Sequence, residues 1–188
     1  VAFKARLGSA SASAEGALGA SGDALAWTFD VPDLRILASE AAGRVAASGV
    51  LRGRFPEPGL ELQVKGSGLR WGESLQAARL AARGELAEGW TGRLALAASA
   101  DALRLGAASF DASRIEVEGT RAAHDVRIAT ASGAHRLEAQ ANGALEPGPS
   151  WRGALAALRI AGPVPTELEA PVALAASATE VSVGPARL

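Results

Sequence analysis

Apolar and polar residues alternate with a period of two along most of this chain. In the segment 23–31, Leu25, Trp27, Phe29 and Val31 fall on one face, whereas alanine, threonine and aspartate fall on the other. Alternation over four to eight residues is typical of a half-buried β-strand. The pattern recurs at 1–7, 45–51, 60–64, 94–96, 103–105, 115–117, 126–128, 137–139, 168–174 and 181–183. It predicts an all-β chain of about fourteen strands.

About a quarter of the residues are alanine, which favours helices. Two windows allow a helix. In 33–42, Asp33 can cap a helix after Pro32, and we predict a short helical turn there. The window 73–83 also alternates from Leu80 to Leu86, so we favour a strand for it.

The alternation slips by one residue at two places. Leu155 has the opposite parity to Leu158 and Ile160, and Leu75 the opposite parity to Leu80. A one-residue slip moves side chains to the other face unless a β-bulge re-aims them. We therefore predict a bulge at each place.

One phrase occurs twice. Residues 84–94 read Gly-x-Leu, a polar turn and Trp-x-Gly-x-Leu, and residues 143–155 repeat this order. Recurrence of this kind indicates a repeat architecture. We interpret residues 1–188 as a single fragment of a larger repetitive domain, with possible repeat boundaries near 32–43, 84–92 and 143–153.

A sheet with one apolar face must hide that face by closing as a barrel or by folding over on itself. Several inward positions are small, and aromatic residues make up only 4% of the chain. Small residues either draw two walls together as a dry core or leave space between them. From the residues alone the two outcomes stay equally open. The small inward residues are Ala5, Ala14, Ala47, Ala82, Ala139 and Ala170.

Charge and composition argue against several partners. The formal net charge is −1, and no basic cluster interleaves with aromatic residues, so we expect no nucleic-acid partner. Cysteine is absent, and no run approaches the roughly 20 apolar residues that span a bilayer. Because the chain starts at Val1 with no apolar signal segment, we expect a piece of a larger protein whose anchor lies elsewhere.

The residues predict no enzyme, no cofactor and no metal site. Thr120, His124 and Asp125 are the only nucleophilic-looking group, but neighbours on a strand point to opposite faces, so Asp125 cannot orient His124. We interpret Thr120 and His124 as structural. His135 lies eleven positions further on, and two histidines do not supply three metal ligands.

Other motifs also have structural interpretations. Glu116 and Glu118 alternate against apolar neighbours, so we place them on a solvated outer wall. Gly66 and Gly68 precede a strand pattern rather than a helix, which argues against a dinucleotide site. Trp90 and Trp151 either stabilise a turn beside a glycine that makes room for the indole, or lie at a rim where lipid headgroups gather.

The order of these signals resembles the family of the translocation and assembly module subunit TamB, and more loosely the AsmA-like bridge proteins. The residues that carry the resemblance span nearly the whole chain and are similar to the later repeats of such proteins. They are Gly22-Asp23-Ala24-Leu25, Pro32-Asp33-Leu34, 42–49, Leu51-Arg52-Gly53, 58–62, Gly119-Thr120 with His124, Gly143 with Leu145, Trp151 with Gly153 and Leu155, and Leu168 with Pro171.

The resemblance implies an elongated β-taco, a U-shaped sheet with an apolar groove. It also implies the periplasm of a Gram-negative bacterium, an inner-membrane anchor, and an outer-membrane partner of the Omp85 type (TamA-like) that contacts parts outside this chain. The expected groove lining is Leu25, Trp27, Phe29, Val45, Leu60, Leu62, Val64, Leu94, Leu96, Leu103, Leu105, Ile115, Val117, Val126, Ile128, Leu137, Leu155, Leu168, Val172, Leu174, Val181 and Val183.

Two functions are compatible with this interpretation. In the first, the groove carries phospholipid acyl chains between the inner and outer membranes. In the second, exposed strand edges template outer-membrane proteins such as autotransporters by β-augmentation. In either case the end strands of an uncapped repeat fragment are exposed, so we expect end-to-end self-association.

Overall fold

The structure is a computed structural model that describes residues 2–54, 57–146, 150–177 and 179–187. Val1 of the first predicted strand lies outside these residues. So do Pro56, for which the prolines and glycine of 56–59 predict a turn, and residues 147–149 of the polar turn in the repeated phrase.

The described residues form one antiparallel sheet of fourteen strands, which confirms the predicted fold class and strand number. Strands follow one another in sequence order from β1 to β11, then β13 and β14, and β12 pairs separately with β11. The strands are β1 (Ala2–Leu7), β2 (Ala10–Gly16), β3 (Ala24–Val31), β4 (Ala41–Arg52), β5 (Gly59–Trp71), β6 (Leu75–Leu86), β7 (Arg93–Leu105), β8 (Ala108–Thr120), β9 (His124–Ser132), β10 (His135–Glu146), β11 (Ser150–Ala161), β12 (Thr166–Glu167), β13 (Val172–Ala176) and β14 (Val181–Val183).

Both helical windows are settled by the structure. Window 73–83 is a strand, as predicted, and the first window holds a short 3-10 helix, η1 (Leu34–Ile36). The side chain of Asp33 caps η1 by accepting the Arg35 backbone N–H at 3.0 Å. Hydrogen bonds from the Arg35 guanidinium hold the pKa of Asp33 below its ordinary value.

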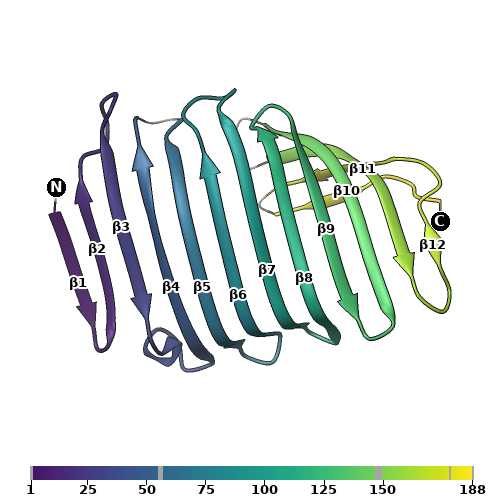
Figure 1. Cartoon of the computed structure of the whole chain (residues 1–188), viewed down its shortest axis with the longest axis horizontal. Helices are drawn as coiled ribbons and strands as arrows, with labels where there is room; N and C mark the ends of the chain where they lie inside the picture. Colours follow the sequence, from purple (N-terminus) through teal and green to yellow (C-terminus); the bar gives the residue numbers. More distant parts are fainter. Residues whose placement is uncertain (1, 55–56, 147–149, 178, 188) are drawn as a thin grey trace.

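The strands run between two rims (Figure 1). The lower rim carries the turns β1–β2, β5–β6, β7–β8 and β9–β10, together with η1. Most of these are tight turns with glycine at positive φ in the first turn position, as in Gly8 (58°) and Gly106 (56°). The upper rim carries the longer connections 17–23 and 87–92, the turn 121–123, and the described residues 53–54 and 57–58 between β4 and β5.

Register aligns the apolar residues of successive strands into rows on one face, here called the inner face. Residues directly opposite each other in antiparallel strands share a face. None of the residues in the rows that start from Leu25, Trp27 and Phe29 is Lys, Arg, Asp or Glu. The row from Trp27 continues through Gly49, Leu62, Gly84, Leu96, Val117, Val126, Ala141, Leu155 and Val172.

A line of irregularities crosses β4, β5, β6 and β7 near the lower rim. Positive φ values mark it at Gly43 (104°), Gly68 (57°) and Ala102 (49°). A Cβ on Gly66 would lie 2.8 Å from Cδ1 of Leu69, so the Leu69 side chain lies on the inner face despite its opposite parity. Because the alternation is reset at this line, apolar residues face inward both above and below it.

The predicted slip between Leu75 and Leu80 is the part of this line that lies in β6. Ala77 is buried and Leu80 half-buried, whereas Ala78 and Arg79 between them are both exposed. Two successive outward residues are what a bulge produces, so the structure confirms this prediction.

The second predicted slip is also confirmed. The register of β10 and β11 shifts between Gln140 and Ala141, so that Ala139 faces Leu158 and Ala141 faces Leu155. At the same level the neighbouring strand breaks into β12 and β13. The upper parts of β10 and β11 turn back behind the sheet in Figure 1. Such bulges bend strands and increase their twist.

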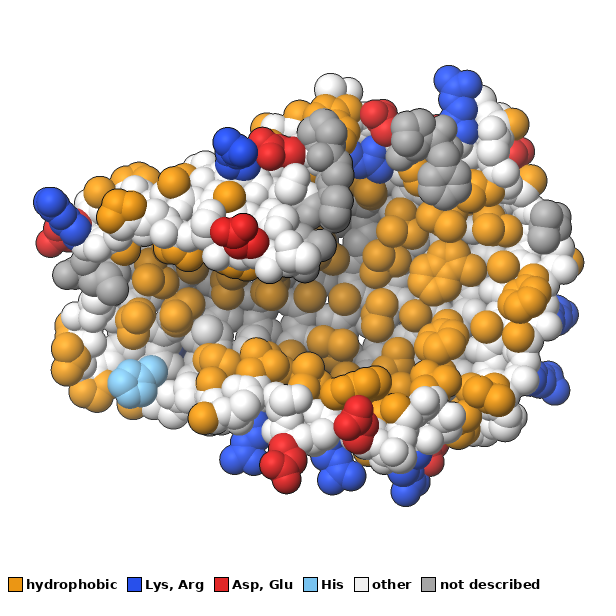
Figure 2. Space-filling model, turned by 180° about the vertical axis from the view of Figure 1, so that it is seen from behind, with side chains coloured by type: hydrophobic (Ala, Val, Ile, Leu, Met, Phe, Trp, Pro, Cys, Tyr) orange, Lys and Arg blue, Asp and Glu red, His pale blue; other side chains and the backbone are white. Residues whose placement is uncertain are grey.

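The sheet is open rather than closed on itself. Figure 2 looks into the hollow formed by the inner face, where hydrophobic side chains cover the floor and charged groups lie along the margins. Few apolar residues of the described chain are buried: Ala10, Val31, Ala41, Ala77, Ala100 and Val172. A dry sandwich would bury its large inward side chains, so the structure excludes that alternative.

Candidate functional site

The inner face is the candidate site, and the strand register shows where the expected lining residues lie; that they line a lipid groove stays a prediction. Most lie directly in the inner rows, including Leu25, Val126 and Leu155. Leu168 lies just beyond β12, where its backbone N–H donates to Leu158 O at 2.9 Å and sets it beside an inner residue. Leu103 and Leu105 have the opposite parity to Leu94 and Leu96, and they reach this face because the bulge at Ala102 shifts the alternation of β7 by one residue.

Sequence reasoning missed part of this surface. Leu69, Trp71, Leu75 and Phe110 extend the inner face below the line of bulges. The parity slip between Leu75 and Leu80 was the available signal. A slip alone does not say whether the apolar residues before the bulge and those after it share one face of the sheet. Ala170, which is predicted to face inward, lies exposed between β12 and β13, so its inward position stays a prediction.

Two indole rings lie flat against the floor over glycines. A Cβ on Gly49 would lie 2.7 Å from Cζ2 of Trp27. A Cβ on Gly153 would lie 2.6 Å from Cη2 of Trp151, and Gly143 opposite is also covered by this ring. The prediction that glycine makes room for the Trp151 indole is therefore confirmed. Large rings over bare backbone keep the floor continuous without a deep pocket.

His124 is a structural residue, as predicted. Its Nε2 accepts the Trp151 indole N–H at 2.7 Å, and its Nδ1 donates to Thr120 O at 2.9 Å. The hydroxyl of Thr120 also bonds to the backbone of Ala123. With both ring nitrogens engaged, His124 is not free to act as a base toward Thr120. The pair instead fixes Trp151 against the floor.

Arg121 ties the upper rim together. Its side chain is almost fully buried, at 8% exposure, and its guanidinium donates to Gly89 O at 3.1 Å and to Pro58 O at 2.8 Å. Its own carbonyl accepts the Leu145 N–H at 2.8 Å. One side chain therefore joins the connections after β4, β6 and β8.

Charged residues lie on the outer face, where they form exposed ion pairs. Arg79 meets Asp101 across β6 and β7 at 2.9 Å, and Arg159 meets Glu167 across β11 and β12 at 2.8 Å. Exposed pairs of this kind contribute about 0–1 kcal/mol each. Glu116 pairs with Arg114 at 2.8 Å, in keeping with its predicted place on the outer wall.

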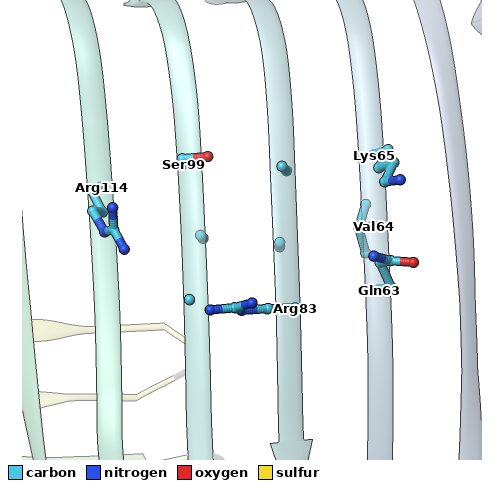
Figure 3. A pocket seen from close by; sticks show the side chains of 10 residues that line it. Gln63, Val64, Lys65, Arg83, Ser99 and Arg114 are labelled. Atoms are coloured by element: carbon cyan, nitrogen blue, oxygen red, sulfur yellow. The ribbon is translucent and has the colours of Figure 1, made fainter.

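A shallow depression of about 230 Å³ indents this outer face (Figure 3). Lys65, Arg83 and Arg114 stand around it, and its floor is made by small residues such as Ala81 and Ala97. It lies on the opposite side of the sheet from the hollow. It is basic, and its lining contains no acid–base pair suited to catalysis.

Within the described chain, no three His, Cys, Asp or Glu residues come together as a metal site. None of the helices described is long and apolar enough to span a membrane.

Comparison with protein families decides the family. The model of the TamB N-terminal domain matches residues 2–186, nearly the full length of the chain. The chain belongs to the TamB family. No match is found among curated proteins or solved structures. The matching model is that of the N-terminal domain, so the expected likeness to the later repeats of such proteins is corrected.

Membership has two consequences for this TamB-family chain. The family is a transport or assembly module of the Gram-negative envelope rather than a family of enzymes. The open, groove-forming sheet is the architecture that the resemblance implied. The hollow is therefore the part of the molecule in which to seek its function.

Proposed function

We propose that this TamB-family chain is a periplasmic bridge segment whose hollow carries phospholipid acyl chains between the inner and outer membranes. In this role it supports outer-membrane biogenesis without acting as an enzyme. The headgroups stay in water while the tails slide along the inner face. The anchor in the inner membrane and the Omp85-type partner in the outer membrane are contacted by other parts of the protein.

One observation carries the proposal: the inner face is apolar, continuous and unfilled. Its large side chains stay partly exposed, as shown by Ile115 at 39% and Ile128 at 37%. Exposed apolar surface of this extent usually marks a binding site in a soluble domain. Each buried methylene of an acyl chain contributes about 0.8 kcal/mol, so even a partial tail is held.

The shape of the site favours movement over tight binding. Rows of similar side chains repeat at each strand, about every 4.8 Å. The indoles of Trp27 and Trp151 lie flat over glycines and do not form deep pockets. A tail that shifts by one strand therefore meets nearly the same surface.

Photo-crosslinking tests the proposal. A photoreactive residue at Leu94, Leu103 or Val126 is expected to capture phospholipid in cells. The same residue at the outward Ala129 is expected to capture none, because it faces solvent in β9. Equal labelling at inward and outward positions would contradict the proposal. So would full lipid transport by a chain with charged residues at the inward positions.

A second candidate function rests on the sheet edges. All six residues of β1 and all three residues of β14 are exposed, and among the described residues each strand pairs on one side only. Such edges can accept an incoming strand. In this function the chain is a scaffold for outer-membrane proteins such as autotransporters.

The two candidates make opposite predictions. A scaffold is expected to crosslink to client proteins from edge positions such as Ala5 and Ser182, and to tolerate charges in the hollow. A lipid bridge is expected to lose function when Val126 or Leu62 becomes charged. Edge crosslinks to client strands combined with tolerance of inner charges would favour the scaffold.

A further inference from the structure

The two rims differ in how much apolar surface they expose. At the lower rim Trp71, Leu75 and Leu105 stand opposite one another on β5, β6 and β7. They are 49%, 37% and 47% exposed. At the upper ends of the same three strands the matching inward row is half-buried: it consists of Leu60, Leu86 and Leu94. The apolar surface of the hollow therefore reaches solvent at the lower rim more than at the upper rim.

The rims also differ in charge on the outer face. Directly behind the exposed lower row stand Arg70, Gln76 and Arg104, which are paired across the same strands. Within the described chain, neither arginine forms an ion pair. The corresponding outer row near the upper rim carries acids instead: Glu61, Glu85, Glu118 and Asp125, with Ala95 of β7 between the second and the third. Glu61 is paired with Arg52 and Glu118 with Arg127, and among the residues that the structure describes Glu85 and Asp125 are in no ion pair.

From these two asymmetries we infer that bound phospholipids are held at the lower rim. There Arg70 and Arg104 bind the lipid phosphate, while Trp71, Leu75 and Leu105 support the first part of the acyl chains. This inference rests on the proposed function and adds to it the place and the chemistry of headgroup contact.

The distances allow this arrangement. Arg70 and Arg104 are separated by two strand spacings, about 10 Å, with the Gln76 amide between them. The end of β5 lies one residue beyond Arg70, about 3 Å away. An arginine can lay its stem along apolar surface and keep its guanidinium in water, so both groups can reach a phosphate at the rim.

Two acidic residues oppose the arginines. Glu73 lies exposed in the β5–β6 turn, and Glu40 adjoins it through the hydrogen bond from Gly72 N to Glu40 O at 3.0 Å. Their charges weaken the attraction for phosphate. The inference therefore predicts that removing the charge of Glu73 strengthens headgroup binding.

Competition between two lipids tests the inference. The purified chain is offered equal amounts of dioleoylphosphatidylglycerol and dioleoylglycerol, which have the same tails and differ in the phosphate headgroup. Native mass spectrometry reports the ratio bound. The wild-type chain is expected to prefer the phospholipid. In the double variant Arg70→Gln/Arg104→Gln this preference should fall roughly tenfold, with dioleoylglycerol binding unchanged.

Two further variants sharpen the test. The double variant Arg83→Gln/Arg93→Gln removes the same charge from β6 and β7 away from the lower rim, and is expected to keep the wild-type preference. Glu73→Gln is expected to raise the preference about threefold. Because this turn residue is exposed, its replacement leaves the sheet intact.

The outcomes separate the inference from the proposed function. If the wild-type chain binds neither lipid, the proposed function fails and the inference fails with it. If both lipids bind but the lower-rim and control variants behave alike, the hollow binds lipid and the headgroup site is overturned. The inference is supported if Arg70→Gln/Arg104→Gln lowers the preference for the phospholipid and Glu73→Gln raises it.

Discussion

At the residue scale, the inner surface depends on a few positions where side-chain size and backbone geometry must match. Trp27 lies over Gly49, and Trp151 lies over Gly143 and Gly153. Sequence analysis predicted that glycine gives the Trp151 indole room. It could not predict the hydrogen bond from Trp151 to His124, because these residues lie 27 positions apart and meet only through the register of β9, β10 and β11.

Ala102 adopts a left-handed backbone, with φ of 49°. This conformation costs roughly 1–2 kcal/mol for an L-residue with a Cβ, whereas glycine adopts it freely. Replacing Ala102 with glycine is therefore expected to stabilise the fold by about 0.5–1 kcal/mol. Urea unfolding followed by circular dichroism measures the change.

Two matched variants make this prediction specific. Gly68→Ala places a Cβ at a positive φ with open space around it, and is expected to destabilise by about 1 kcal/mol. Ala129→Gly in regular strand geometry should also destabilise, by about 0.5–1 kcal/mol. A loss of stability in Ala102→Gly as large as that in Ala129→Gly would show that the left-handed geometry at 102 carries no strain.

At the element scale, the strands follow from the sequence much better than their alignment does. The alternation predicted the strands, and the parity slips at Leu75/Leu80 and Leu155/Leu158 predicted the bulges. That the first slip lines up with Gly43, Gly68 and Ala102 in neighbouring strands could not be predicted. Such a line depends on register between strands, which sequence periodicity does not specify.

The upper rim offers a test of how its connections are held. Arg121 donates to Gly89 O and Pro58 O from a buried position, so its removal leaves two carbonyls without these donors. Arg121→Met keeps much of the side-chain volume and is expected to destabilise the fold by about 1–3 kcal/mol. The midpoint of urea unfolding measures this loss.

Arg93→Met is the matched control. Arg93 is exposed at the start of β7 and makes no ion pair within the described residues. Its replacement is expected to change stability by less than about 0.5 kcal/mol. If both variants unfold at the same urea concentration, the bonds of Arg121 do not hold the rim.

At the scale of the whole molecule, the decisive property is that the sheet stays open. The residues predicted one apolar face but allowed either a dry core or a hollow, because both need small, uncharged inward residues. The curvature of the sheet decides whether its apolar face closes into a dry core or stays open as a hollow. It comes from bulges such as the shift at Gln140/Ala141, summed over many strands. The proposed repeat boundaries near 32–43, 84–92 and 143–153 remain a prediction.

The two end strands belong to the same scale. In the part of the chain that the structure describes, β1 and β14 each have one unpaired edge, and Phe3 (55%) and Val181 (72%) are strongly exposed. We expect the chain to associate end to end at high concentration through these edges. Sedimentation velocity measures the association. Hydrogen-bonded and non-bonded pairs alternate from the bonded pair Leu7/Ala10 that closes the turn, so Lys4 and Ser13 form a non-bonded pair and the Lys4 N–H points to the open edge. Lys4→Pro should therefore reduce the association by removing this donor. A strict monomer at millimolar concentration would contradict this expectation.

The central claim is that the hollow holds phospholipid tails, and lipid bound to the purified chain tests it most directly. The chain is isolated from a Gram-negative periplasm and examined by native mass spectrometry. Phospholipid is expected to accompany the wild-type chain and Ala129→Asp on the outer face, and to be lost from Ile128→Asp on the inner face. A folded wild-type chain that carries no phospholipid, or equal retention by the two aspartate variants, would contradict the claim.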